Sequence, residues 1–223
     1  IIVGEKTDDA TLATGFDYVG QIGKTPIVVN DSRGFYTSRV FGTYVSEGIA
    51  MLAEGVHPRS IEVAGMPMPP LALQDEVSLS LSLHVMEQTK KAMEAEGKTF
   101  TPHPAMSVVE KMVKEFGREG KKVSKGFYDY PENGEKHLLS DLTELFPTTD
   151  EQPSQQDLVD RLLYVQANET AKCYEENVVR TVADANIGSI FGWGFAPNQG
   201  GTLQFINSVG VDKFVARSRE LAQ

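Results

Sequence analysis

The sequence has 223 residues, of which 40% are hydrophobic and 23% are charged, values that are usual for a globular protein with its own core. Its formal net charge of −10 excludes attraction to nucleic acid or anionic membranes through overall charge, although a local cluster of Lys and Arg can still hold an anionic ligand. No apolar run is long enough to span a membrane, and the single cysteine, Cys173, favours a reducing compartment such as the cytoplasm.

The first thirty residues alternate between strand and helix patterns. Residues 1–3 are β-branched or apolar, as strand residues often are, and Thr7-Asp8-Asp9 is typical of a helix N-cap. Apolar residues then recur at helical spacing until Gly23, and residues 25–30 form a second β-branched run. The order strand, helix, strand predicts a short α/β segment.

The rest of the chain predicts helices separated by loops. Apolar periodicity or capping residues indicate helices at 41–52, from about 73, at 104–116, from 158 after a cap at Ser154–Asp157, at 203–209 and at 212–221. Three prolines between 67 and 70 exclude a helix at that point. Residues 131–156 are acidic and contain prolines, so we predict a linker over the surface there.

An internal repeat relates two parts of this helical region. Glu47, Glu54 and Val56 recur as Glu169, Glu176 and Val178, at a constant offset of 122 residues. Each copy continues with a polar turn, a stretch rich in Pro or Gly, and an apolar helix. We therefore predict a duplication whose two copies pack against each other. The faces expected to be buried are those around Phe41, Tyr44, Ile49, Leu162, Val165 and Tyr174.

Few side chains in this sequence indicate chemistry by their spacing alone. The four histidines, at positions 57, 84, 103 and 137, have no spacing typical of metal ligands, so we predict no metal site. Gly192-Trp193-Gly194 lacks the preceding strand and third glycine of a dinucleotide fingerprint. Phe191, Trp193 and Phe195 are interpreted as core or interface residues. The cluster Lys121, Lys122 and Lys125 is either a solvated face or a holder of phosphate.

A resemblance to a known family goes further than these patterns. Residues 23–35 (GKTPIVVNDSRGF) resemble the domain junction of 3-hydroxyacyl-CoA dehydrogenases of fatty-acid β-oxidation. Further similar segments follow in order, namely Glu54–Val56, Met68–Pro70 with Leu73 and Asp75, Lys125–Tyr128, Ala183–Gly188, Gly192–Pro197 and Gly200–Gly201. The second copy resembles the α-subunit type of multifunctional fatty-acid oxidation protein.

The resemblance implies a fold and a division into domains. The expected fold is mainly α, with duplicated C-terminal helical domains and a short α/β remnant of the NAD-binding Rossmann domain at the N-terminus. We expect the end of the NAD-binding domain at 1–31, the first C-terminal domain at 32–130, the linker at 131–156 and the second C-terminal domain at 157–223. The family's catalytic histidine and glutamate, and its glycine fingerprint, are expected upstream of Ile1, so the fragment itself should be inactive and should not bind NAD appreciably.

The resemblance also assigns three site residues. Ser38 stands where the family has an asparagine that contacts substrate, and we expect it in the first turn of a helix that begins near Phe35. Phe191 stands where some members have a tyrosine that meets substrate, and Lys122 matches a lysine that reaches the NAD cofactor. The segment from Ile61 to Met68 is a few residues shorter than the family's.

The function implied for the whole protein is NAD-dependent oxidation of 3-hydroxyacyl-CoA to 3-oxoacyl-CoA. We also expect an enoyl-CoA hydratase module upstream, and either a homo-oligomer or a complex with a thiolase subunit. We expect neither nucleic acid as a partner nor a membrane span. Two alternatives stay open. One is a non-catalytic module for substrate docking or dimerisation, and the other is an enzyme like 3-hydroxybutyryl-CoA dehydrogenase.

Overall fold

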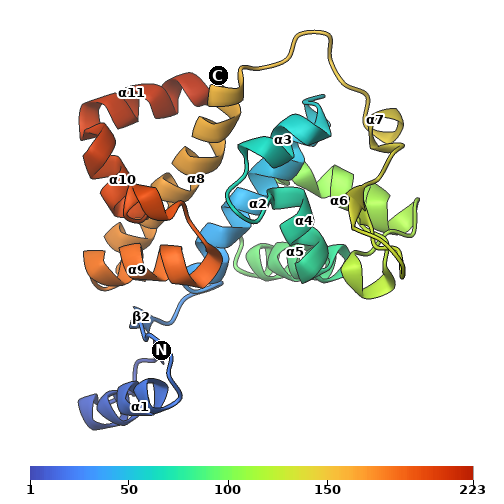
Figure 1. Cartoon of the computed structure of the whole chain (residues 1–223). Helices are drawn as coiled ribbons and strands as arrows, with labels where there is room; N and C mark the ends of the chain where they lie inside the picture. The colour runs from blue at the N-terminus through green and yellow to red at the C-terminus, as the bar shows by residue number, and fades with distance from the viewer. Residues whose placement is uncertain (223) are drawn as a thin grey trace. The chain divides into compact units, whose positions relative to one another are not determined.

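The computed structural model describes residues 1–222 and is mainly helical, which confirms the predicted fold class (Figure 1). The chain divides into two compact units, which we call unit 1 (Ile1–Thr43 and Leu163–Gln223) and unit 2 (Tyr44–Leu162). Among the described residues, no helix is both long and apolar enough to cross a membrane.

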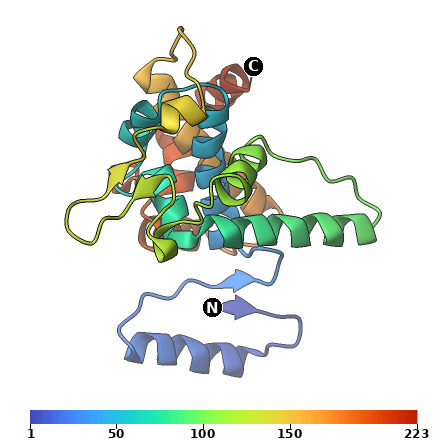
Figure 2. The ribbon, with the colours of Figure 1, turned by 90° about the vertical axis from the view of Figure 1, so that its right-hand side faces the viewer.

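Unit 1 begins with a small parallel pair of strands joined by a helix. Strands β1 (Ile2–Val3) and β2 (Val29–Asn30) are parallel, and α1 (Asp9–Gln21) connects them (Figure 2). The Asp8 side chain accepts a hydrogen bond from the Thr11 N–H at 2.7 Å, so the predicted N-cap is confirmed. Because parallel strands need such a crossover connection, this segment is a βαβ unit, as the sequence predicted.

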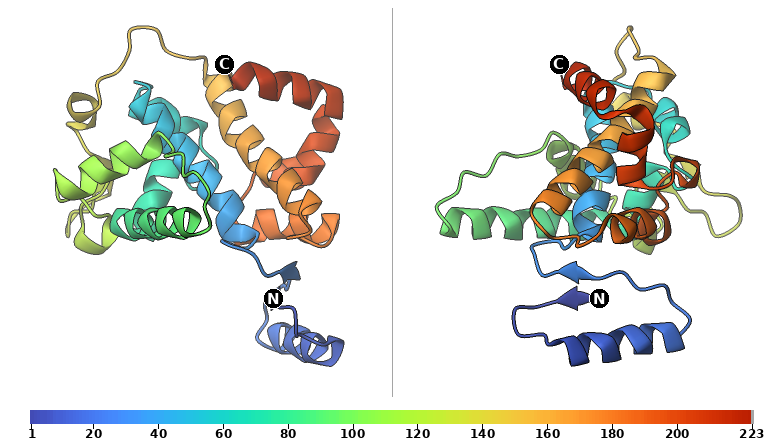
Figure 3. Two further views of the ribbon diagram at one scale, coloured as in Figure 1. Left: turned by 180° about the vertical axis from the view of Figure 1, so that it is seen from behind. Right: turned by 90° about the vertical axis from the view of Figure 1, so that its left-hand side faces the viewer.

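The remainder of unit 1 is helical and packs around aromatic side chains. It contains α8 (Gln155–Glu175) from residue 163 onward, α9 (Val182–Trp193), the 3₁₀ turn η2 (Pro197–Gln199), α10 (Thr202–Val209) and α11 (Val211–Leu221), which are drawn in orange and red in Figure 3. The Tyr164 ring stacks on Phe214 at 4.6 Å and meets Phe205 edge-on at 5.2 Å. Helix α9 was not predicted, although the Thr181 hydroxyl, which accepts from the Asp184 N–H, is a capping signal that marks its start.

Unit 2 holds most of α2 (Thr37–Ala53) and the elements that follow it. These are α3 (Pro58–Ala64), α4 (Pro70–Val77), α5 (Leu79–Ala95), α6 (Ala105–Lys114), η1 (Lys121–Val123), β3 (Tyr128–Asp129), β4 (His137–Leu138) and α7 (Leu142–Leu145). The helix predicted from about residue 73 is in fact two helices, because Ser78 adopts a positive φ of 84° between α4 and α5. Figure 2 shows α5 as a long helix that leads through a loop back to α6.

The segment predicted as a surface linker, residues 131–156, contributes to the core of unit 2. Strands β3 and β4 form an antiparallel hairpin, and the following α7 places Leu142 and Phe146 in buried positions. Both side chains are apolar residues in an otherwise acidic stretch, and their burial keeps this stretch on unit 2. The description of a linker over the surface therefore does not hold for these two residues.

Two equivalent ion clusters reveal the duplication in three dimensions. In unit 1, the Arg39 guanidinium binds Glu169 and Glu176, each at 2.5 Å. In unit 2, the Arg161 guanidinium binds Glu47 at 2.7 Å and Glu54 at 2.6 Å. All three members of one cluster are related to those of the other by the offset of 122 residues. Each arginine thus binds two carboxylates of the other copy.

The segments that precede α2 and α8 also bind the opposite copy, in two equivalent hydrogen bonds. The Asn30 side-chain amide donates to the Asn177 carbonyl at 2.6 Å in unit 1, and the Gln152 side-chain amide donates to the Gly55 carbonyl at 2.9 Å in unit 2. Both acceptor residues have a positive φ, 56° for Asn177 and 85° for Gly55, as is common just after a helix. These four residues also follow the offset of 122, so the predicted contact between the two copies is confirmed.

Most of the side chains expected to be covered by this contact are covered. Tyr44, Ile49 and Leu162 are buried, and Phe41 and Val165 are partly buried. Tyr174 is 45% exposed, contrary to the prediction. It lies in the last turn of α8, where Cys173 is buried and the surrounding residues face solvent.

Removing either arginine should destabilise the protein to a similar degree. Arg39→Ala or Arg161→Ala removes the guanidinium that two neighbouring carboxylates share, and Glu169 and Glu47 are both mostly buried, although Glu169 keeps an exposed partner in Lys172 at 3.4 Å. We expect a loss of about 1–3 kcal/mol in the free energy of unfolding for each variant. Urea unfolding measures this loss.

Lys114→Ala provides the matched control, because Lys114 forms an exposed pair with Glu110 one helical turn away. That variant should lose less than about 0.5 kcal/mol. An effect of Arg39→Ala or Arg161→Ala as small as that of the control would contradict the structural role of the two clusters.

Candidate functional site

Ser38 lies in the first turn of α2, as the sequence predicted. The turn before the helix uses two left-handed residues, Gly34 with φ 78° and Phe35 with φ 49°. Ser38 is exposed, and its hydroxyl forms no hydrogen bond within residues 1–222, whereas its neighbour Arg39 is fixed by two glutamates. The Ser38 hydroxyl is therefore available to a ligand.

Phe191 lies near the end of α9 and is 76% exposed, so it is not a core residue, and its interpretation as an interface residue stays a prediction. The other two aromatic residues of that motif are buried as predicted. The Trp193 indole N–H donates to Gln166 at 2.8 Å, and Phe195 is completely covered. A large aromatic side chain with this exposure is a surface that a ligand or another protein can contact.

Helix α9 passes close to the beginning of α2 within unit 1. A side chain at Gly188 would lie 2.7 Å from the Ile27 Cδ1, and one at Gly192 would lie 3.5 Å from the Thr37 Cγ2. The Tyr36 hydroxyl donates to the Ala185 carbonyl at 2.8 Å. Two of the predicted site residues, Ser38 and Phe191, directly adjoin this close approach in the sequence.

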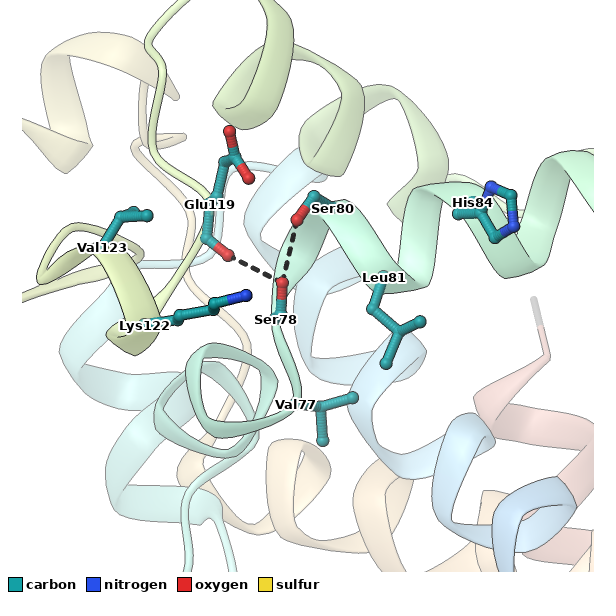
Figure 4. Close-up of a pocket in the computed structure, with 8 residues that line it drawn as sticks. All are labelled: Val77, Ser78, Ser80, Leu81, His84, Glu119, Lys122 and Val123. Carbon is teal, nitrogen blue, oxygen red and sulfur yellow. Dashed lines mark hydrogen bonds between the residues drawn. The ribbon is translucent and has the colours of Figure 1, made fainter.

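The third predicted residue, Lys122, lies in unit 2 and lines an open pocket of about 560 Å³ (Figure 4). The other lining residues come from the end of α4, the beginning of α5 and the segment around η1, namely Val77, Ser78, Ser80, Leu81, His84, Glu119 and Val123. Lys122 is exposed and forms no ion pair or hydrogen bond with the part of the chain that the structure describes. Its ammonium group points toward Ser78.

A buried carboxylate, Asp75, fixes the backbone of the motif Lys125–Tyr128. It accepts hydrogen bonds from the Phe127 N–H at 2.8 Å, the Tyr128 N–H at 2.9 Å and the Tyr130 hydroxyl at 3.0 Å. Burial raises the pKa of Asp75 to about 6, against the lowering effect of these hydrogen bonds. Gly126 is required here, because a Cβ would lie 2.0 Å from the Asp75 Oδ1. We assign Asp75 a structural role.

Glu62 is a second buried carboxylate that sequence reasoning missed. It accepts from the Leu71 N–H at 2.9 Å and from the Tyr128 hydroxyl, and burial raises its pKa. Its position in the short helix α3 carried no signal for a buried acid. Because its oxygens are occupied by α4 and β3, it ties these elements together rather than facing the pocket.

The motif of the second copy also has a structural explanation. The Asn186 side-chain oxygen accepts from the N–H groups of Leu203 at 3.0 Å and Gln204 at 3.1 Å. A Cβ at Gly201 would lie 2.5 Å from the Asn186 Cα. Asn186 thus caps the beginning of α10 from another helix, and the glycine allows the close approach.

The histidines do not form a catalytic or metal-binding group. The Nδ1 atoms of His57 and His103 accept from nearby backbone N–H groups, and His84 contacts Gln88 on α5. Within residues 1–222, no three His, Cys, Asp or Glu side chains come together in a way that could hold a metal ion.

Comparison with known proteins gives a family match for the first copy. Residues 34–130 match the family described as 3-hydroxyacyl-CoA dehydrogenase, C-terminal domain. The fold resembles 3-hydroxybutyryl-CoA dehydrogenase from Escherichia coli K12, with a TM-score of 0.72 and 18% identity over 100% of this chain. It also resembles the dehydrogenase part of multifunctional enzyme 1 from C. elegans, with a TM-score of 0.60 and 26% identity over 87% of this chain. The chain spans 62% and 45% of the lengths of these two proteins.

The stability of the protein should depend on pH through Asp75. Its pKa is about 6 in the folded protein, above the ordinary 3.8, so the folded protein binds this proton more tightly than the unfolded chain. The resulting stabilisation is present below the ordinary pKa and is lost as the pH rises through the folded pKa. Compared with Asp75→Asn, which does not titrate, the wild-type free energy of unfolding should fall by on the order of 3 kcal/mol across this window.

Urea unfolding of both proteins at a series of pH values tests this expectation. Because every other group is shared, the difference between the two curves reports Asp75 together with its electrostatic effect on neighbours such as Glu62. A difference that stays constant from acidic to neutral pH would contradict a raised pKa at this position.

Proposed function

From the premise that residues 34–130 belong to the 3-hydroxyacyl-CoA dehydrogenase family, as its C-terminal domain, we propose that the whole protein oxidises 3-hydroxyacyl-CoA to 3-oxoacyl-CoA. In this reaction the hydride on C3 goes to NAD and the hydroxyl proton goes to a base. The match over these residues carries the proposal. The contacts of Asp75 with Gly126, Phe127 and Tyr128 support it. They show that two segments similar to the family, one with Asp75 and one at Lys125–Tyr128, bind each other.

The βαβ unit of this chain does not fit the phosphates of NAD. A dinucleotide site needs a glycine-rich turn and a helix N-terminus free to receive the pyrophosphate. Here the turn between β1 and α1 has one glycine, Gly4, and the N-terminus of α1 carries Asp8 and Asp9 beside Glu5. These carboxylates would repel a pyrophosphate, so we propose that other residues of the whole protein bind NAD and supply the base.

The chain's own residues would contribute to substrate binding. We propose that the Ser38 hydroxyl hydrogen-bonds the substrate oxygen at the position where the family has an asparagine. The exposed ring of Phe191, close to the start of α2, would cover an apolar part of the same substrate. The resemblance assigns Lys122 to the cofactor, and its unpaired ammonium group is suited to an anionic ligand.

The second candidate function is a non-catalytic module for docking or assembly. The reciprocal clusters around Arg39 and Arg161 favour it, because they join residues of the two copies in contacts that serve the structure. We propose further that the whole protein is cytoplasmic and forms a homo-oligomer or a complex with a thiolase subunit. An assay for 3-hydroxyacyl-CoA-dependent NADH formation by the full-length protein distinguishes the two candidates.

Replacing Ser38 should weaken catalysis moderately in the full-length protein. Loss of one neutral hydrogen bond costs about 0.5–1.5 kcal/mol, so Ser38→Ala should lower kcat/KM by roughly two- to tenfold. Loss of a catalytic base would cost about a hundredfold or more. Steady-state kinetics with a 3-hydroxyacyl-CoA measures the ratio.

Ser107→Ala is the matched control, because Ser107 is an exposed helical serine that only contacts the Pro104 carbonyl. It should leave kcat/KM unchanged. Wild-type kinetics in Ser38→Ala would remove Ser38 from the proposed site and leave it an ordinary residue on a helix surface.

A further inference from the structure

The loop between β3 and β4, residues 131–136, takes no part in the proposed function. All six residues are exposed, and Figure 2 shows this stretch as an open loop. Within residues 1–222, the backbone N–H groups of residues 132–136 have no hydrogen-bond acceptor. The loop is held at its ends, where Asp129 pairs with His137 and the Lys136 ammonium group lies 5.3 Å from the centre of the Tyr128 ring.

Asn133 and Gly134 lie in the middle of this loop. Asn133 is one of seven asparagines in the sequence and the only one that is followed by glycine. Its side-chain amide makes no hydrogen bond with the part of the chain that the structure describes, so the amide carbon Cγ is open to attack. Gly134 has no side chain beside its backbone nitrogen, and its φ of 141° is one that other residues adopt only with strain.

This pair of residues favours attack of the Gly134 nitrogen on the Asn133 Cγ. The nitrogen loses its proton to hydroxide and bonds to Cγ, and the Cγ–Nδ2 bond breaks as Nδ2 takes a proton from water and leaves as ammonia. The product is a five-membered succinimide ring. Water then opens the ring at either carbonyl, which gives aspartate or isoaspartate. The net reaction consumes water and releases ammonia, and it needs no oxidant or cofactor.

The other exposed asparagines lack these features. Asn198 is followed by Gln199, whose N–H donates to the Ala196 carbonyl at 3.0 Å. Asn177 is followed by Val178, whose N–H donates to a carbonyl of α8 at 2.7 Å. The fourth exposed asparagine lies inside α10, where backbone N–H groups are used by the helix. At these sites a hydrogen bond has to break before the nitrogen can attack, and a side chain stands next to that nitrogen.

We propose that Asn133 is a site of spontaneous deamidation, at which the folded protein acquires an aspartate or an isoaspartate. Asparagine is among the thermolabile residues of proteins, and the open loop leaves this one unprotected. The new carboxylate lies between Glu132 and Glu135 and adds one negative charge to an acidic chain. Because no backbone hydrogen bond of the loop depends on Asn133 or Gly134, the fold of unit 2 is retained after the conversion. The reaction is independent of dehydrogenase activity.

Peptide mass spectrometry on the chain of residues 1–223, incubated at mildly alkaline pH, tests the proposal. Deamidation adds about one mass unit at the modified asparagine. In the folded protein, Asn133 should convert at least roughly tenfold faster than Asn198, because a hydrogen bond and a bulkier neighbour slow the attack at Asn198. The rate at Asn133 should rise with pH, because the attacking nitrogen has to lose its proton.

The same measurement in guanidinium chloride separates the effect of the fold from that of the sequence. Asn133 should convert within roughly threefold of its rate in the folded protein, because a loop without backbone hydrogen bonds opens at little cost in free energy. Asn198 should convert at least about threefold faster after unfolding, because its neighbour's N–H is released. Equal rates at the two residues in the folded protein, or a strong acceleration at Asn133 on unfolding, would overturn the site.

Two variants complete the test. Gly134→Ala places a methyl group next to the attacking nitrogen and should slow the conversion of Asn133 toward the rate of Asn198; an unchanged rate would contradict the proposed attack. Asn133→Asp supplies one product directly and should unfold at the same urea concentration as the wild type. A clear loss of stability in Asn133→Asp would contradict the claim that the fold of unit 2 is retained. An isoaspartyl methyltransferase with a labelled methyl donor should mark the incubated wild type but not Asn133→Asp, and equal labelling of both would place the isoaspartate elsewhere.

Discussion

The pairing of one arginine with two glutamates, formed twice, is the interaction on which the rest of the helical structure depends. Each guanidinium binds a partly buried glutamate and a more exposed one that follows it by seven residues, or about two helical turns. The carboxylates are close enough to share one cation, and without it they would face each other uncompensated. Each cluster joins the first turns of one long helix to the other copy. The first turns of α2 therefore belong to unit 1, and the first turns of α8 belong to unit 2.

The segments that precede α2 and α8 also contact the opposite copy, next to the two ion clusters. Asn30 and Gln152 both donate to the carbonyl of a residue that lies two positions after the end of the opposite copy's long helix. Two sequence changes, Asn to Gln and Gly to Asn, preserve this bond because both amides are donors and both acceptor positions tolerate a positive φ. The duplication is therefore preserved at the level of hydrogen-bond chemistry even where the residues differ.

The motifs that resemble those of 3-hydroxyacyl-CoA dehydrogenases divide into structural and exposed residues. Asp75 with Gly126, and Asn186 with Gly201, are pairs in which a polar side chain needs a glycine opposite it. Lys122 and Phe191 are, in contrast, exposed, and neither is used to hold the fold together. Residues of the first kind maintain the helical domain, and residues of the second kind are the ones that a substrate, cofactor or partner can meet.

The sequence by itself determined the elements whose signals are local. The Asp8 and Ser154 caps, the helical periodicity of α2 and α8, the proline-rich turn and the offset of 122 all depend on neighbouring residues or on direct comparison of two segments. Only the tertiary structure decided that Phe191 faces solvent while Trp193 is buried, that Leu142 and Phe146 enter a core, and that Ser78 breaks a helix. It also revealed Glu62 and the pocket beside Lys122. The physical reason is that burial, pKa and the pairing of charges are set by residues far away in the chain, which no local pattern records.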